Sequence, residues 1–333
     1  MHILSLRFPV RLWRKSERSA DALGWSALAG TIAAGSTYNA FAKVLTDSLS
    51  PLSLVILGEL LALLFLVLWF GAVPLLRECR ALPRRTIMPL LAVGLLSGTI
   101  APLLLFAGLR ETGAVNAVLF GNTEMLFLLL LAVAVLGERL EPSHYLSIAA
   151  IAFGIVFIAF RGFTEQLSFQ RSDLLLILAS FTFSVGSLVF RRYLHEVPSH
   201  TVILSRSLVA LVGLLFVSFF LPSPFLRETQ ALHPGLFPTL LGFVLISRLL
   251  SLSCFYKALD HLPVSSISLF SNLHIITSIL FTHWFLGEPV FGYQVAGGAF
   301  IIFGAVLLEL TGRHHPSPQH QEAHLEQRHS HRV

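Results

Sequence analysis

The sequence predicts an all-α integral membrane protein with ten transmembrane helices, arranged as two inverted five-helix repeats. Only 12% of its 333 residues are charged and 55% are hydrophobic, whereas soluble domains carry about 25% charged residues. Apolar runs long enough to cross a bilayer recur along the chain, and residues 106–158 align with residues 256–308 without a gap. A duplicated block of membrane helices is typical of secondary transporters.

Five apolar segments form the first half, and residues that end or turn a helix separate them. A helix needs about 20 apolar residues to cross the hydrocarbon core. Ser50-Pro51, Pro83, Gly113 and Pro142 fall at the gaps between such runs, where they favour helix ends. We therefore expect helices over residues 25–44, 52–71, 88–109, 114–136 and 144–160.

The second half follows the same plan. Pro198, Pro222, Pro234 and Pro263 fall between its apolar runs, and no loop is long enough for a soluble domain. The expected helices span residues 173–191, 201–221, 236–256, 264–285 and 291–310. The predicted divisions are an N-terminal segment (1–23), the first repeat (24–161), a connecting loop (162–172), the second repeat (173–311) and a His-rich tail (312–333).

The alignment of the two halves has a constant offset of 150 residues. Because each repeat holds an odd number of helices, the second copy must enter the membrane from the opposite face. The two halves are then related by a pseudo-two-fold axis in the membrane plane. Identical pairs include Leu119-Phe120 with Leu269-Phe270, Asn122 with Asn272, Leu136-Gly137-Glu138 with Leu286-Gly287-Glu288, and Phe153-Gly154 with Phe303-Gly304.

The basic residues predict the orientation. If the N-terminus is cytoplasmic, sixteen Lys and Arg residues lie on that side and five lie on the other. This bias follows the positive-inside rule, so we expect both termini in the cytoplasm and the protein in the cell (inner) membrane. The first apolar run is long enough to span, so we expect a helix there and no signal peptide.

We expect the functional site to be formed by ionisable residues inside the predicted helices. A charge at the bilayer centre costs roughly 2.5–3.5 kcal/mol, so such side chains must face one another or a wet cavity. Intramembrane ionisable residues are functional-site candidates by default. They are Glu59, Glu124, Arg206, Arg248 and His274.

The repeat relates these residues in pairs. Glu59 and Arg206 each lie eight residues after a proline that starts a helix, and Glu124 and His274 are equivalents by the alignment. A simpler alternative is that Glu59 and Arg206 pair to hold helices together. Asn122 and Asn272 add an amide to each side and are equally suited to join helices by hydrogen bonds. These seven residues form the predicted substrate- and ion-binding set.

Individual roles follow from chemistry. Glu124 has no cation near it in the sequence, and a buried carboxyl in that situation could carry a proton. Arg206 and Arg248 could hold an anionic group such as a carboxylate, and His274 could tune Glu124 or make one interhelical hydrogen bond. Glu138 and Glu288 follow Leu-Gly at helix ends, so we expect them to fix helix-end turns rather than to touch substrate.

Metal, cofactor and nucleic-acid functions are not expected. The tail contains six of the fourteen histidines, but their spacing matches no defined site, so we expect a disordered cytoplasmic tail. Cys79 and Cys254 lie in a polar loop and an apolar run, which predicts neither a disulfide nor a metal site.

Two five-helix halves that each close with Leu-Gly-Glu and a short Gly-bearing helix resemble the EamA-like branch of the drug/metabolite transporter superfamily, over about residues 24–311. The resemblance implies that helices 1–4 and 6–9 line a central cavity and that the cargo is a small organic metabolite, amino acid or drug, often exported. Glu59 departs from the pattern, because similar proteins commonly carry arginine there. Met125 and Ile275 replace a usual proline, so we expect helices 4 and 9 to bend less.

The predicted function is a secondary transporter of a small organic solute, an exporter with Glu124 or Glu59 as the site of proton coupling. Facilitated diffusion without protons and a lipid-carrier flippase share the architecture and remain alternatives. An intramembrane enzyme is less favoured, because no metalloprotease, nucleophile-elbow or phosphate-loop motif occurs in the sequence. The sequence leaves the oligomeric state open.

Overall fold

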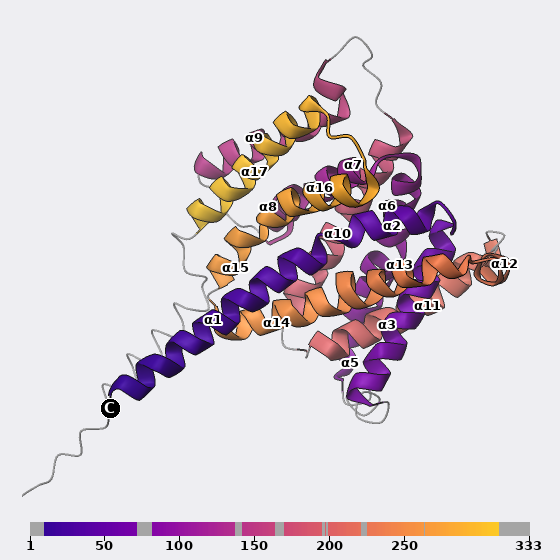
Figure 1. Cartoon of the computed structure of the whole chain (residues 1–333), viewed down its shortest axis with the longest axis horizontal. Coiled ribbons are helices and arrows are strands. Elements are labelled where there is room, and N and C mark those ends of the chain that lie inside the picture. The colour runs from indigo at the N-terminus through magenta and orange to yellow at the C-terminus, as the bar shows by residue number, and fades with distance from the viewer. Residues whose placement is uncertain are drawn as a thin grey trace, which may run out of the picture.

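The computed structural model consists of helices, and no strand occurs in the residues that it describes (Figure 1). In the described part of the chain, six helices are long and apolar enough to cross a membrane. Three shorter apolar helices, His144–Ala159, Leu273–Leu286 and Gly292–Leu308, accompany them. These helices are those of a multi-pass integral membrane protein. The described residues are 10–71, 82–136, 142–163, 170–194, 197, 199–220, 225–262 and 264–312.

The helices that follow Ser50, Pro83 and Gly113, and the one that begins at Pro142, start where the sequence predicts helix starts. Ser50 precedes a helix whose first residue is Pro51, and its hydroxyl accepts a hydrogen bond from the backbone N–H of Ser53 at 3.3 Å, which satisfies a free donor of the first turn. The elements are α1 (Val10–Gly35), α2 (Tyr38–Thr46), α3 (Pro51–Phe70), α5 (Arg84–Leu95), the π-helix η1 (Leu96–Ile100), α6 (Ala101–Glu111), α7 (Ala114–Gly121), α8 (Thr123–Leu136) and α9 (Pro142–Ala159).

The second half starts after the short 3₁₀ turn η2 (Arg161–Phe163). Gln170 and Asp173 form a capping box at its first helix, an arrangement that satisfies two free backbone donors. The elements are α10 (Arg171–Tyr193), α11 (Ser199–Phe220), α12 (Phe225–Gln230), η3 (Pro234–Leu236), α13 (Phe237–Leu241), the π-helix η4 (Gly242–Leu250), α14 (Ser251–His261), α15 (Val264–Ser271), α16 (Leu273–Leu286) and α17 (Gly292–Gly312).

Several predicted helices are divided. The predicted helix 25–44 begins earlier, at Val10, and is broken at Ser36 and Thr37. The helices predicted at 114–136 and 264–285 are interrupted at Asn122 and Asn272, although both helices lack proline at these positions. At the break in the helix 114–136, the Asn122 side chain donates to the Val118 carbonyl at 2.7 Å. This amide replaces a backbone donor, so a proline is not needed to break the helix.

Helices of one half pack against helices of the other. α1 lies along α14, and its counterpart α10 lies along α6. α9 and α17 run side by side (Figure 1). A Cβ added to Gly154 would lie 2.6 Å from the Gly297 carbonyl oxygen, so these two helices touch through their backbones, as small residues permit.

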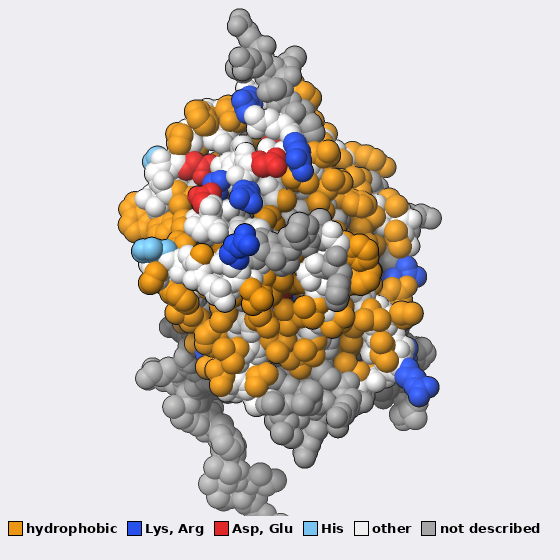
Figure 2. All heavy atoms as spheres, turned by 90° about the vertical axis from the view of Figure 1, so that its right-hand side faces the viewer, with side chains coloured by type: hydrophobic (Ala, Val, Ile, Leu, Met, Phe, Trp, Pro, Cys, Tyr) orange, Lys and Arg blue, Asp and Glu red, His pale blue; other side chains and the backbone are white. Residues whose placement is uncertain are grey.

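Apolar side chains cover much of the outer surface. Trp69, Val212 and Trp284 are 84%, 68% and 79% exposed, which suits contact with acyl chains. Figure 2 shows hydrophobic side chains over most of one face, with the charged ones gathered toward one part of it. Inside the bundle, Leu54 and Leu119 are fully buried in the largest core cluster. The interior therefore holds two kinds of surface, an apolar core and the polar residues described below.

The short helix α12 of the second half contacts the N-terminal end of α3 in the first half. The backbone N–H and the hydroxyl of Ser50 donate to the Glu228 carboxylate of α12 at 2.9 and 2.8 Å. Burial raises the pKa of Glu228, but hydrogen bonds from Ser53 and Ser50 outweigh it and hold this pKa below its usual value. Glu228 therefore stays ionised and favours the N-terminal end of α3.

Candidate functional site

A cavity of about 440 Å³ lies between the two halves. Its lining residues come from helices of both halves, but α9 and α17 contribute none of those described, as the resemblance implied for helices 5 and 10. Asn272 is not among the lining residues. The other six residues of the predicted binding set line the cavity: Glu59, Asn122, Glu124, Arg206, Arg248 and His274.

A buried ion pair forms one wall of this cavity. Glu59 of α3 is 2% exposed, and its Oε1 accepts a hydrogen bond from Nη2 of Arg248 at 2.6 Å. Its Oε2 accepts from the Ser207 hydroxyl at 2.5 Å. Arg206 also attracts Glu59 electrostatically. The carboxylate partner expected for Arg248 is thus supplied by the protein itself.

The position of Arg248 depends on a π-helix. Arg248 lies in η4, whose wider turns differ from those of the flanking α-helical segments α13 and α14. π-turns are rare and often occur at functional sites. The guanidinium lies over Gly58, where an added Cβ would be 3.1 Å from Nη1. Glycine at this position therefore leaves room for the arginine beside Glu59.

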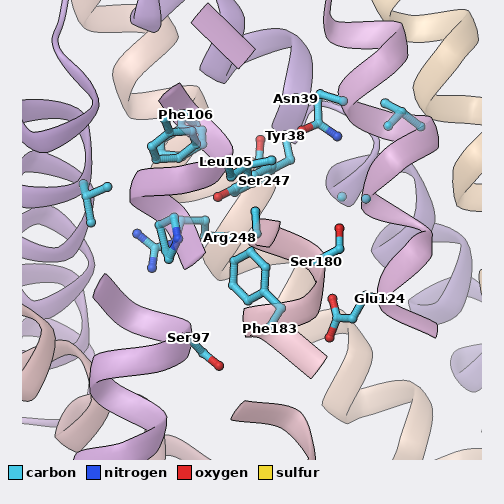
Figure 3. A pocket seen from close by; sticks show the side chains of 18 of the residues that line it. Tyr38, Asn39, Ser97, Leu105, Phe106, Glu124, Ser180, Phe183, Ser247 and Arg248 are labelled. Atoms are coloured by element: carbon cyan, nitrogen blue, oxygen red, sulfur yellow. The ribbon is translucent and has the colours of Figure 1, made fainter. Parts of the chain in front are cut away.

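Glu124 lies on a separate wall, two residues after the helix break. The Ser187 hydroxyl donates to its Oε1 at 3.0 Å, and the Ser184 hydroxyl donates to its backbone carbonyl at 2.8 Å. Both serines belong to α10. Figure 3 shows Glu124 across the cavity from Arg248, with Phe183 between them. The ion pairs of the described residues do not include Glu124, so this carboxyl is the one open to a proton or a cation.

His274 packs against the break in the first helix. A Cβ added to Gly35 would lie 3.2 Å from two atoms of the imidazole. The Ser278 hydroxyl is 3.4 Å from Nε2 of the ring, which is long for a hydrogen bond. No hydrogen bond between His274 and Glu124 occurs among the described contacts, so the tuning of Glu124 by His274 stays a prediction.

The comparisons with known proteins agree with this architecture. The sequence model of the EamA-like transporter family matches residues 22–160 and again residues 170–310. The chain belongs to the EamA-like transporter family. Two tandem matches, one for each half, confirm the duplication and identify a membrane transporter family.

Two relatives of this EamA-like protein are named as uncharacterized transporters. It is 25% identical over 270 residues to an uncharacterized transporter of Synechocystis sp., with 78% of this chain and 76% of the relative covered. It is 27% identical over 233 residues to an uncharacterized transporter of Methanothermobacter thermautotrophicus, with 69% and 66% covered. A crystal structure with 19% identity shares the fold, with a TM-score of 0.56 over 89% of this chain and 99% of that one.

Sequence reasoning missed the uncharged polar residues of the cavity. Tyr38, Asn39, Ser97, Ser180 and Ser247 also line it (Figure 3). Tyr38 belongs to an aromatic cluster, because its ring centroid lies 5.0 Å from that of Phe243 and 6.3 Å from that of Phe106. The signal was present as the polar run from residue 36 to residue 39 inside an otherwise apolar segment, which also marks the break between α1 and α2.

The duplicated Leu-Gly-Glu motif has an architectural role in the second half. Gly287 ends α16 with a left-handed conformation at φ 65°. Glu288 then accepts hydrogen bonds from the backbone N–H groups of Ala114 and Val115 at 2.8 and 3.2 Å. The motif therefore turns its own helix and caps α7 of the other half. Glu138 and the His-rich tail lie outside the described residues.

The described residues contain no group of three His, Cys, Asp or Glu side chains that could hold a metal ion. Cys254 is a free thiol in α14, and Cys79 lies outside the described part of the chain. The chemistry of the described cavity is thus that of two carboxylates, two guanidinium groups, an imidazole, amides and hydroxyls.

Proposed function

We propose that the protein is a secondary transporter that moves a small organic solute across the membrane by alternating access. The observation that carries this proposal is a polar cavity lined by both halves of the bundle. A cavity at a repeat interface is where such transporters bind substrate. Ten membrane crossings, as two inverted repeats with both termini in the cytoplasm, complete the proposal. The odd number of helices per repeat and the positive-inside bias support it.

The cargo class follows from the charges of the cavity. Glu124 is half-buried and has serine as its hydrogen-bond partner, and a carboxylate withdrawn from water needs a proton or a cation to offset its desolvation. An amine-bearing solute, amino acid-like or drug-like, supplies that cation. Phe183 and Tyr38 offer aromatic surface for its apolar part, and an ammonium group is also attracted by an aromatic face.

Glu124 is also the proposed coupling residue. If a proton and an ammonium group compete for this carboxyl, the inward movement of a proton drives the outward movement of the amine. Glu59 is less suited to this role, because Arg248 and Ser207 engage both of its oxygens. The proposed direction is export into the medium from the cytoplasm, across the cell (inner) membrane.

The experiment measures flux in proteoliposomes. A thermal-shift panel of amines and amino acids on the solubilised protein first selects a ligand, because a ligand that binds the folded form raises its melting temperature. Flux of that ligand is then followed with and without a pH gradient. We expect gradient-driven flux in the wild type, its loss in Glu124→Gln, and its retention in the matched control Glu111→Gln, which removes an exposed carboxylate outside the cavity.

Flux that ignores the pH gradient would replace proton coupling with facilitated diffusion. Full pH-driven flux by Glu124→Gln would reject Glu124 as the coupling residue. An absence of flux for every soluble ligand that binds would reject the solute carrier and direct the tests to lipid-linked substrates. These three outcomes separate the cargo, the coupling residue and the class of transporter.

A further inference from the structure

The buried carboxylate of Glu59 offsets one of the positive charges that line the cavity. Glu59 occupies the position that Arg206 occupies in the other half, so the internal repeat relates residues of opposite charge. Both line the cavity, together with Arg248. With Glu59 in place, the described lining holds two acidic and two basic side chains besides a histidine.

At the cavity wall, Glu59 is more deeply buried than Arg248. The Arg248 side chain is 19% exposed and that of Glu59 is 3% exposed. The ion pair is short, at 2.6 Å, and the second oxygen of Glu59 is held by the Ser207 hydroxyl. A guanidinium in such a site would otherwise be a strong receptor for a carboxylate, because charge-assisted pairs of this kind are about twice as strong as neutral hydrogen bonds.

We propose that Glu59 is the residue that determines the charge selectivity of the cavity. By neutralising Arg248 through their ion pair, it excludes solutes whose only charge is a carboxylate. Removal of its charge exposes the guanidinium and converts this wall into a carboxylate-binding site. This inference rests on the proposed function and extends it, because it names a class of solute that the same cavity does not bind.

The physical reason is that a second carboxylate cannot share Arg248 without cost. Glu59 lies in contact with Arg248, so an anion on the guanidinium would lie close to the Glu59 charge, and like charges in a poorly solvated site repel strongly. An uncompensated guanidinium in the same site is itself costly. An anion that enters after Glu59 is neutralised therefore relieves that cost.

The test uses two probes of similar shape and opposite charge, benzoate and benzylamine. Each is titrated at pH 7 onto the full chain in detergent, with the melting temperature as the measure of binding. The proteins are the wild type, Glu59→Gln, Glu59→Met and the double variant Glu59→Gln/Arg248→Gln. We expect benzoate to bind Glu59→Gln and Glu59→Met at least tenfold more tightly than the wild type. We expect the double variant to lose that gain.

Two results would overturn the proposal. The first is benzoate stabilising the wild type as effectively as it stabilises Glu59→Gln. If the variants do not fold, benzoate stabilising the wild type as strongly as benzylamine does overturns the proposal as well. The second is a gain that persists in the double variant, which would assign the anion site to another cation. Benzylamine binding to the wild type reports on the proposed amine site with Glu59 unchanged, so failure of the proposed transport function and failure of the selectivity switch are distinguishable.

Discussion

The contact of Glu288 with the start of α7 makes a strong prediction about stability. Glu288 is half-buried and joins the α16–α17 loop of the second half to the first turn of a cavity-lining helix of the first. Next to it, Gln294 donates to the Asn116 side chain at 2.7 Å. Replacing Glu288 with Ala removes the acceptor for two backbone donors of α7, and Gln keeps an acceptor but removes the charge.

The magnitude follows from these contacts. Loss of a capping acceptor costs about 0.5–2 kcal/mol, and a favourable charge at a helix N-terminus contributes about 0.3–1 kcal/mol. One bond is short at 2.8 Å and the other is long at 3.2 Å, so we expect Glu288→Ala to cost about 2 kcal/mol and Glu288→Gln about half of that. A cost of 1 kcal/mol lowers the melting temperature of a medium-sized domain by about 2–4 °C.

The assay is thermal unfolding in detergent, with Glu111→Ala as the control. Glu111 pairs with Arg171 at 3.9 Å between side chains 42% and 80% exposed, and such surface pairs contribute little. Equal melting temperatures for Glu288→Ala and Glu111→Ala would refute the reasoning. A Cβ on Gly113 would overlap the Glu288 carboxylate, so Gly113→Ala should destabilise the wild type but cost less in the Glu288→Ala background.

Three further predictions concern other contacts between the halves. The pKa of Glu228 is lowered in the folded protein. The stability that this carboxylate gives to the fold should therefore be complete above the ordinary glutamate pKa of about 4.3 and be lost as the pH falls through the lowered pKa. The melting temperatures of the wild type and Glu228→Gln should accordingly converge in acid. Gly297→Leu should lower the melting temperature markedly, because a Cβ there would lie 2.9 Å from the carbonyl oxygen of Gly154 in α9. Gly292→Leu should leave the melting temperature unchanged, because no atom lies within 4 Å of a Cβ added there. Ser207→Ala leaves one oxygen of the buried Glu59 carboxylate without its hydroxyl partner and should lower the stability of the fold by about 1–3 kcal/mol. Ser218→Ala, which removes an exposed hydroxyl, is the control. Equal losses of stability in the two variants would contradict the role given to Ser207.

The helices and the repeat could be predicted from the sequence because apolar length and turn residues are local signals. The break between α1 and α2 has a signal in the polar run from residue 36 to residue 39, but the break at Asn122 depends on a single side chain. Asn122 interrupts its helix by donating to a carbonyl four residues earlier, and nothing in the hydropathy of that segment marks it. The π-helical turns of η1 and η4 likewise lie in segments whose composition is that of ordinary membrane helices.

The membership of the site was easier to predict than its contacts. Charged residues in apolar segments must avoid lipid, so their type alone placed five of them at the cavity. Their partners depend on how helices from different halves meet, which spacing along one helix does not encode. Glu59 and Arg206 are equivalent by the repeat, but the short ion pair joins Glu59 to Arg248, a residue from a different helix of the second half.

The same repeat relates the Glu59–Arg248 ion pair to a contact of a different kind in the other half. At the offset of 150 residues, the counterpart of Arg248 is Gly98. A Cβ added to Gly98 would lie 3.4 Å from Cγ of Arg206, so Arg206 packs over Gly98 much as Glu59 faces Arg248. One contact is an ion pair and its counterpart is an arginine stem on a glycine. If the two halves exchange conformations during transport, the exchange does not create an ion pair between positions 98 and 206, so we expect the two end states to differ in energy.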